Sequence, residues 1–329
     1  MKQGLVSIGI PTYNSQDRLG PLFENFQKQT YRNLELIVSD DASRDNTFAV
    51  CQSYAAKDSR MRCIRQEKNL GQLGNFPFVL SQAKGEYFMW ASDDDHWSHE
   101  FVEKLVSVLE AHPECGVAMS SYARVFTDRS QKVFLMEGPY DLSGKSYFYS
   151  FRQMVLDAPI HAISYGIFRR DFLTALMQRP RPGCMRWERV LMAEVTLVTH
   201  ISTIPEVLFF KHENPIPMAT RYQDVLSHAY GKPFALLRYA VALLFRQITS
   251  PMIPLYRKVY VVIPWIELMV WRRRSYFEDL VRGIKIIIDL LRNNFRSEIL
   301  EFRDKIVEQI LRPTCKVSQE ILRRFWPKL

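Results

Sequence analysis

Short apolar runs alternate with amphipathic stretches over the first 112 residues of the chain. The apolar runs predict buried strands, and apolar residues that recur every three or four positions predict helices. The expected strands and helices, in chain order, are 5–10, 15–28, 34–39, 45–57, 61–65, 74–84, 86–91 and 98–112. The first strand is expected to end before Pro11, because proline does not fit inside a central ladder. This alternation favours a mostly parallel sheet with helices on both faces, which is an α/β fold.

The regular alternation ends near residue 113. Further strands are expected at 115–122, 163–168 and 204–210, a strand or hairpin within 125–136, and a helix at 187–199. Beyond about residue 222 the pattern is helical, and we find no strand signal. We therefore expect one α/β domain in two halves, 1–112 and 113–225, followed by a C-terminal helical region at 226–329.

Composition and charge narrow the class of protein. A net charge of +9 indicates an anionic substrate or partner, but no nucleic-acid-binding motif accompanies the basic residues. The five cysteines are scattered and form no C-x-x-C pair, which argues against a disulfide framework and a zinc site. We find no signal peptide and no apolar run of the roughly 18 residues that span a bilayer. The sequence thus favours a cytoplasmic location, with peripheral contact to the inner face of the membrane left open.

Polar residues gather where three of the predicted strands end. Pro11-Thr12-Tyr13-Asn14 follows the first strand, Asp40-Asp41 ends the second, and Asp93-Asp94-Asp95 follows the fourth. Ligands of open α/β sheets bind at this edge. Adjacent carboxylates repel one another unless a cation lies among them, and Mg²⁺ or Mn²⁺ commonly shares a substrate phosphate with such carboxylates. The alternative is that the acidic triplet is a solvated turn or caps the next helix.

Four segments then match one family in order: residues 6–14, residues 37–45, Asn69-Leu70-Gly71, and residues 85–95. Together they resemble the opening strand, the V-D-D-x-S-x-D segment, the N-x-G turn and the metal motif of family-2 glycosyltransferases. The resemblance implies the A-type nucleotide-diphospho-sugar transferase fold. Residues 1–112 would then bind the nucleotide sugar, and residues 113–225 would face the acceptor.

The resemblance also implies a donor site. Its residues would be Pro11, Thr12, Tyr13, Asn14, Asp41, Asn69, Gly71 and Asp93. Pro11 and Tyr13 would wall the nucleobase, and Asp41 would accept a hydrogen bond from it. The alternatives from the residues alone are plain packing for Tyr13 and helix capping for Asp41. Asn69 and Gly71 would shape the loop beside the donor, unless they form an ordinary turn.

The metal motif departs from the family pattern Asp-x-Asp-Asp. Ser92 stands where the first Asp is usual, so Asp94 and Asp95 are the expected ligands of Mg²⁺ or Mn²⁺. Asp93 is the alternate ligand, and weak or absent metal dependence is the remaining possibility.

An inverting transfer needs a base that takes the proton from the acceptor hydroxyl. The family places this acid at the start of a helix, and Glu188 holds that position, where Asp is more usual. The alternative for Glu188 is an acid that interacts favourably with the helix dipole, and Glu194 is the second candidate for the base.

The sequence thus predicts an inverting glycosyltransferase that uses a nucleoside-diphosphate sugar and a saccharide or lipid-linked acceptor in cell-envelope polysaccharide or glycolipid synthesis. Two alternatives remain, a sugar-phosphate nucleotidyltransferase and a non-catalytic nucleotide-sugar-binding protein. The first would require a Gly-rich basic loop, whereas Pro11-Thr12-Tyr13-Asn14 stands there. The helical region would contact a membrane surface, pack on the catalytic domain or form a homodimer.

Overall fold

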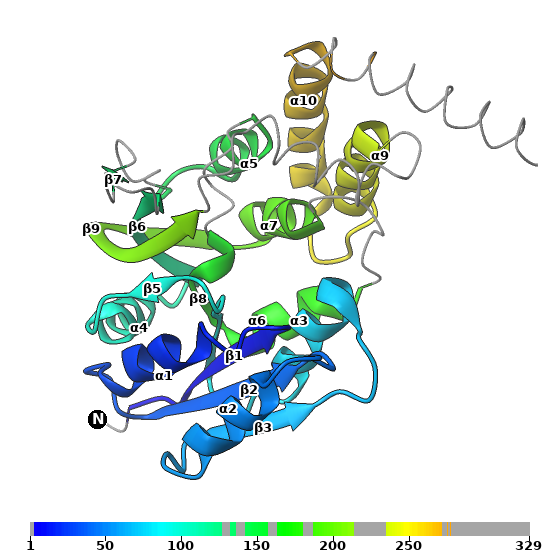
Figure 1. Ribbon diagram of the computed structural model, residues 1–329. Helices are drawn as coiled ribbons and strands as arrows, with labels where there is room; N and C mark the ends of the chain where they lie inside the picture. Colours follow the sequence, from blue (N-terminus) through cyan, green and yellow to red (C-terminus); the bar gives the residue numbers. More distant parts are fainter. Residues whose placement is uncertain are drawn as a thin grey trace, which may run out of the picture.

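The computed structural model describes residues 3–126, 132–135, 142–156, 163–179, 187–213, 235–271, 275 and 277. Nine strands form one sheet: β1 Val6–Thr12, β2 Leu34–Asp40, β3 Met61–Arg65, β4 Tyr87–Trp90, β5 His96–Trp97, β6 Cys115–Phe126, β7 Lys132–Leu135, β8 Ile167–Arg169 and β9 His200–Glu213. Their order is β3-β2-β1-β4-β8-β6-β9-β5, with β7 beside β6 (Figure 1). The α/β fold class is as expected.

The first half of the sheet is parallel and the second half is mixed. Strands β1 to β4 pair in parallel, so their carboxyl ends meet at one edge. Strand β8 then pairs antiparallel with both β4 and β6, while β9 runs parallel to β6. The two-residue strand β5 pairs antiparallel with β9 and is the last strand in the order. Strands as short as β5 and β8 carry too few residues for an alternation signal, so the sequence did not predict their pairing.

Strand β1 does not end before Pro11, which corrects the sequence prediction. It continues to Thr12 in register with β2, so that Pro11 pairs with Ser39. Pairing with β4 ends earlier, at Gly9 opposite Trp90. The Gly9 carbonyl accepts the Ala91 N–H (2.9 Å) and therefore points toward β4. The backbone nitrogen of Pro11, two residues later, points toward the same side of β1, where β4 no longer pairs with it. The missing N–H of Pro11 therefore costs no ladder bond.

Helices cover both faces of the sheet (Figure 1). They are α1 Leu19–Gln27, α2 Thr47–Ala55, α3 Gly71–Ser81, α4 Phe101–Ala111, α5 Tyr147–Leu156, α6 Arg170–Met177, α7 Trp187–Val198, α9 Ala235–Ile248 and α10 Leu255–Trp271. Helix α3 begins three residues before its predicted start. Helices α5 and α6 were not predicted.

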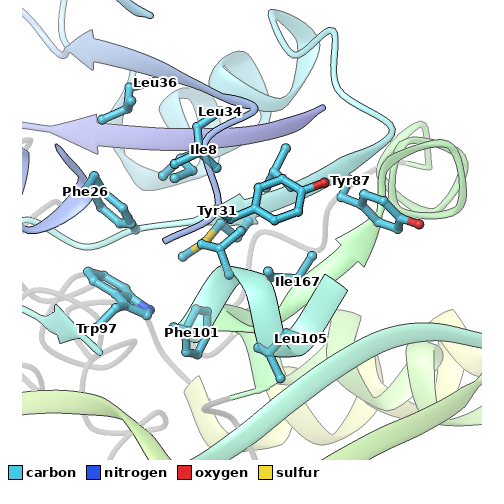
Figure 2. Packing of buried hydrophobic residues seen from close by; sticks show 14 of the residues in the cluster. Ile8, Phe26, Tyr31, Leu34, Leu36, Tyr87, Trp97, Phe101, Leu105 and Ile167 are labelled. Carbon is cyan, nitrogen blue, oxygen red and sulfur yellow. The ribbon is translucent and has the colours of Figure 1, made fainter. Parts of the chain in front are cut away.

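Two apolar cores hold these layers together, one on each face of the sheet. On one face Ile8 and Leu36 pack with Phe26, Trp97 and Phe101 (Figure 2), and the Phe26 and Trp97 ring centroids lie 5.2 Å apart. On the other face, a Cβ on Gly9 would meet Phe88 and Val79 at 2.7 and 2.8 Å. Only glycine lets β1 approach those side chains so closely.

The helices α9 and α10 pack on the second half of the sheet through α7 and α5. Glu194 of α7 is fully buried and accepts hydrogen bonds from Arg246 (2.6 Å), Arg179 (2.5 Å) and Ser250 (2.5 Å). Between α10 and α9, the Trp265 indole donates to the Ala240 carbonyl (2.8 Å). The predicted boundary near residue 225 lies outside the described residues. None of the helices in the described ranges has both the length and the apolarity to cross a membrane.

Candidate active site

The loop after β4 is tied to the loop after β1 through Asp93. Its carboxylate accepts hydrogen bonds from Thr12 Oγ1 (3.1 Å) and from the Ser15 hydroxyl, and it pairs with Arg18 (3.2 Å). Thr12 and Ser15 are buried, so this network forms the floor of the site. The structure thereby brings the predicted residues Thr12 and Asp93 together at the carboxyl edge of the sheet. Asp93 therefore holds the loop after β1 in position.

Asp41, at the end of β2, fixes the loop that opens α3. Its two carboxylate oxygens accept the N–H groups of Leu70 (2.6 Å) and Gly71 (2.9 Å), and the Asn69 side chain donates to the Asp41 carbonyl (3.2 Å). The helix that Asp41 caps is therefore α3, which explains the early start of this helix. Gly71 has a φ of +65°, a left-handed conformation that glycine adopts freely. Asp41, Asn69 and Gly71 thus form one structural unit.

The remaining donor-loop residues lie between these two networks. Asn14 and Ala42 both adopt left-handed backbone conformations, with φ of 50° and 57°. Such a conformation costs a non-glycine residue about 1–2 kcal/mol, less for Asn. The Asn14 N–H donates to Ser43 (2.9 Å), which joins the β1 and β2 loops. Tyr13 is 41% exposed and Pro11 is half-buried, so both present apolar surface at this edge.

The three carboxylates of the acidic triplet point to different partners. Asp93 faces the β1 loop, Asp94 is exposed and accepts a hydrogen bond from the Ser92 hydroxyl, and Asp95 is buried. Asp95 accepts the His212 N–H (2.9 Å) and lies 3.6 Å from the Lys211 ammonium. The three groups face different partners, although the charge of Asp94 still raises the pKa of Asp95.

Asp95 is the buried carboxylate of the acidic triplet. Burial raises the pKa of Asp95 to about 7, although the positive charge of Lys211 favours the ionised form. Asp95 Oδ2 and His212 Nδ1 are buried and have no hydrogen-bond partner among the described residues. No group of three or more His, Cys, Asp or Glu side chains within the described residues is arranged to hold a metal ion. Mg²⁺ tolerates such a site, because it is often held by one or two carboxylates with substrate phosphates.

A cavity of about 440 Å³ is lined in part by Lys211, whose ammonium lies 3.6 Å from the Asp95 carboxylate. Its lining residues come from α3, β4, the turn before β8, α7 and β9: Gln72, Phe76, Trp90, Ser164, Tyr165, Trp187, Glu188, Leu191, Met192 and Lys211. Glu188, in the first turn of α7, is half-buried in this wall. Glu194, the other candidate base, is held instead by Arg179 and Arg246 in the protein interior. Of the two candidate bases, Glu188 lines the cavity.

Tyr165 lies in the cavity wall together with Glu188. Burial raises the pKa of Tyr165, and the negative charges of Asp95, Asp94 and Glu188 raise it further. The Lys211 ammonium lies 4.9 Å from the centre of the Tyr165 ring, within the range of a cation–π contact. Lys211 and Tyr165 thus add one cation and one hydroxyl to the cavity.

The sequence interpretation assigned no role to Tyr165 or Lys211. Lys211 directly follows the predicted strand at 204–210, so its place after a strand was a usable signal. Tyr165 lies in the short turn before β8, where the pattern predicted a strand and pointed to no site. No local signal in the sequence distinguishes Tyr165 from a core aromatic residue.

Known relatives are similar to about a third of the chain. Glycosyltransferase GlyG of Streptococcus pneumoniae is 32% identical over 118 residues, which is 36% of this chain and 39% of that protein. The UDP-Glc:alpha-D-GlcNAc-diphosphoundecaprenol beta-1,3-glucosyltransferase WfaP of Escherichia coli is 35% identical over 106 residues, 32% of this chain and 41% of that protein. The chain thus matches about two fifths of the length of these relatives.

Solved structures are similar to this chain in fold. Staphylococcus aureus TarS 1-349 in complex with UDP-GlcNAc superposes with a TM-score of 0.60 at 16% identity, covering 86% of this chain and 81% of that one. The mannosyltransferase PcManGT of Pyrobaculum calidifontis, in complex with GDP-Man and Mn²⁺, gives a TM-score of 0.52 at 16% identity, with coverages of 90% and 88%. At this identity the likeness concerns the fold alone.

The family model described as Glycosyl transferase family 2 matches residues 7–176. That range contains β1, the Asp41 loop, the acidic triplet and Tyr165, and it confirms the resemblance of the four sequence segments. Because the match covers just over half of the chain, the chain belongs to glycosyl transferase family 2.

Proposed function

We propose that this chain transfers a sugar, with inversion, from a nucleoside-diphosphate sugar to an acceptor hydroxyl. One observation carries the proposal: Glu188 and Lys211 line the same cavity, and the Lys211 ammonium lies 3.6 Å from Asp95 of the acidic triplet. A base for the acceptor and a binding site for the leaving diphosphate are the two groups that a single displacement needs. Family membership and the fold shared with nucleotide-sugar complexes support the same reaction.

The donor would lie along the carboxyl edge of β1, β2 and β4. Pro11 and Tyr13 offer apolar surface to a base, and Asp41 retains acceptor capacity because a carboxylate has about four lone-pair sites. Asp41, Asn69 and Gly71 are locked to one another, which fixes the loop before a donor arrives. Binding to a preorganised loop loses less conformational entropy than binding to a loose one.

A divalent cation at this edge would be held by Asp94, with Asp95 as the second carboxylate. Asp94 is exposed, and the buried Asp95 Oδ2, which accepts no hydrogen bond among the described residues, lies 3.6 Å from the Lys211 ammonium. When bound, Mg²⁺ or Mn²⁺ would act as a Lewis acid that neutralises the diphosphate. The Mn²⁺ in the PcManGT complex belongs to that protein and supports the assignment by analogy of fold.

The residues of the chain divide the reaction between them. Glu188 accepts the proton of the acceptor hydroxyl as the oxygen attacks the anomeric carbon from the side opposite the diphosphate. The bond from the anomeric carbon to the diphosphate oxygen breaks, and the nucleoside diphosphate leaves with the electron pair. Lys211, in the cavity wall, adds positive charge near the departing oxygens. The apolar rings of Trp90, Trp187 and Phe76 limit the access of water to the cavity.

The acceptor class follows from the relatives. The printed name of WfaP specifies a diphosphoundecaprenol-linked sugar, and that of the Bacillus subtilis relative TuaG, 26% identical over 139 residues, specifies putative teichuronic acid biosynthesis. We therefore place the acceptor among saccharides and lipid-linked saccharides of the cell envelope.

The test measures nucleoside-diphosphate release from a panel of UDP-, GDP- and dTDP-sugars, with Mn²⁺ and with EDTA. We expect release from one donor class that rises when envelope glycolipids are added. If the protein instead joins a nucleoside triphosphate to a sugar phosphate, releasing pyrophosphate, it is a nucleotidyltransferase. Tight donor binding without release under any condition would favour the non-catalytic alternative.

A further inference from the structure

Helix α10 presents an apolar side to solvent. Every exposed residue of this helix is aliphatic or aromatic: Leu255, Tyr256, Val259, Val262, Ile263, Ile266, Val270 and Trp271. Most of them recur at spacings of three and four, which places them along one side of the helix. The opposite side of α10 buries Val261, Pro264 and Leu268 against the protein. The exposed set is called the apolar face below.

The apolar face is unusually costly to leave in water. Leu255 is 82% exposed, Val259 62%, Ile263 55% and Val270 59%. Single exposed apolar residues are ordinary on protein surfaces, whereas a continuous stripe marks a contact with another molecule.

A groove deepens one end of the apolar face. It has a volume of about 560 Å³ and lies between α10 and α5, lined by Ile266, Val270 and Trp271 with Leu156 at its side. An ion pair between Arg152 and Glu267 (2.7 Å) borders it. An open apolar groove of this size accommodates a length of hydrocarbon chain.

Charge and aromatic placement identify the contact. Tyr256 and Trp271 lie near the two ends of α10, and the sequence directly after Trp271 is Arg272-Arg273-Arg274. Aliphatic residues flanked by aromatic rings and basic residues suit the interface of an anionic bilayer. A second copy of this chain is less suitable, because two molecules of net charge +9 repel each other as they approach.

We infer that the apolar face docks on an anionic lipid bilayer, with α10 lying in the plane of the headgroup region. With 17 residues, α10 is about 25 Å long, and membrane helices need about 20 apolar residues to span. Insertion of one side to the acyl boundary removes its apolar residues from water. This inference goes beyond the proposed function and does not depend on it. Docking would bring the catalytic domain to a surface where lipid-linked acceptors reside.

The test is co-sedimentation of the full chain with vesicles of phosphatidylcholine containing 30% phosphatidylglycerol, and with vesicles of phosphatidylcholine alone. We expect the wild type to bind the anionic vesicles at least about tenfold more tightly than the neutral ones, because basic residues near the surface are attracted to anionic lipids. The double variant Ile263→Glu/Ile266→Glu should lose at least about tenfold in binding to the anionic vesicles. Its matched control is Gln52→Glu/Ser53→Glu on α2, which adds the same charge at exposed positions away from α10 and should bind as the wild type does.

A second pair, Ile263→Ser/Ile266→Ser, reduces apolarity without adding charge and should also weaken binding. Circular dichroism and nucleotide binding of each variant establish that it is folded, and they report on the proposed function separately. The inference is overturned if the wild type fails to bind vesicles, or if the folded Ile263/Ile266 variants bind as tightly as the control. It is also overturned if light scattering shows a wild-type dimer that these variants dissociate while vesicle binding is unchanged.

Discussion

Replacement of Glu188 by Gln is expected to lower kcat by about 100- to 10,000-fold, the usual contribution of a positioned general base. The amide keeps the size of the side chain but cannot accept the acceptor proton. Glu188 lines the cavity together with Tyr165 and lies outside the predicted donor loops, so its loss should affect turnover rather than donor binding. The measurement is steady-state transfer with the donor and acceptor identified by the panel, beside a direct titration with the nucleoside diphosphate.

Glu206→Gln is the matched control for this experiment. Glu206 is an exposed acid of β9 that pairs with Lys104, and exposed pairs contribute little to stability. Its variant should keep wild-type kcat. Glu188→Asp should retain more activity than Glu188→Gln, because the shorter side chain still accepts a proton. If Glu188→Gln keeps more than a tenth of wild-type kcat, Glu188 is not the base.

Replacement of Asp94 by Asn is expected to reduce kcat by about 100- to 1,000-fold, comparable to the loss of one group that stabilises transition-state charge. Asp94 is the exposed member of the acidic triplet, whereas Asp93 faces Thr12 and Asp95 faces Lys211. The variant should also need more Mn²⁺ for half-maximal activity. A Mn²⁺ titration of the transfer rate for both proteins provides the measurement.

Asp171→Asn supplies the control for the Asp94 variant. The Asp171 side chain is 90% exposed and pairs with Arg170, away from the cavity lining. Its variant should titrate with Mn²⁺ as the wild type does. If the wild type is fully active in EDTA and Asp94→Asn is also fully active, the transfer does not depend on a divalent cation. Lys211 would then be the group that neutralises the diphosphate.

The parallel half of the sheet was predictable because its strands are apolar runs with polar residues at their ends. Strand β3 spans the predicted residues, and the ends of β1, β2 and β4 meet as expected. Pro11 was misjudged because its effect depends on where β4 ends, which is a property of the neighbouring strand. The start of α3 was misplaced because Asp41, 30 residues away from Gly71, supplies its cap.

The site was predictable in its donor half and less so in its acceptor half. Hydrogen bonds join Thr12 to Asp93, and a separate set joins Asp41 to Asn69 and Gly71. The contact of these residues with a donor stays a prediction. Lys211 and Tyr165 reach the cavity from β9 and from the turn before β8. Such long-range convergence leaves no periodicity in the sequence. The separate partners of Asp93, Asp94 and Asp95 likewise depend on neighbours far along the chain.

The central claim is that a diphosphate binds at the carboxyl edge of β1, β2 and β4, beside Asp94 and within reach of the Glu188 cavity. The most direct measurement is a crystal structure with Mn²⁺ and the nucleoside diphosphate that binds best, using the anomalous signal of manganese. The account predicts a manganese peak that joins the Asp94 carboxylate to the diphosphate, with the base beside Tyr13 and Asp41. A nucleotide bound elsewhere on the protein, or at this edge with its diphosphate remote from both Asp94 and Lys211, would contradict it.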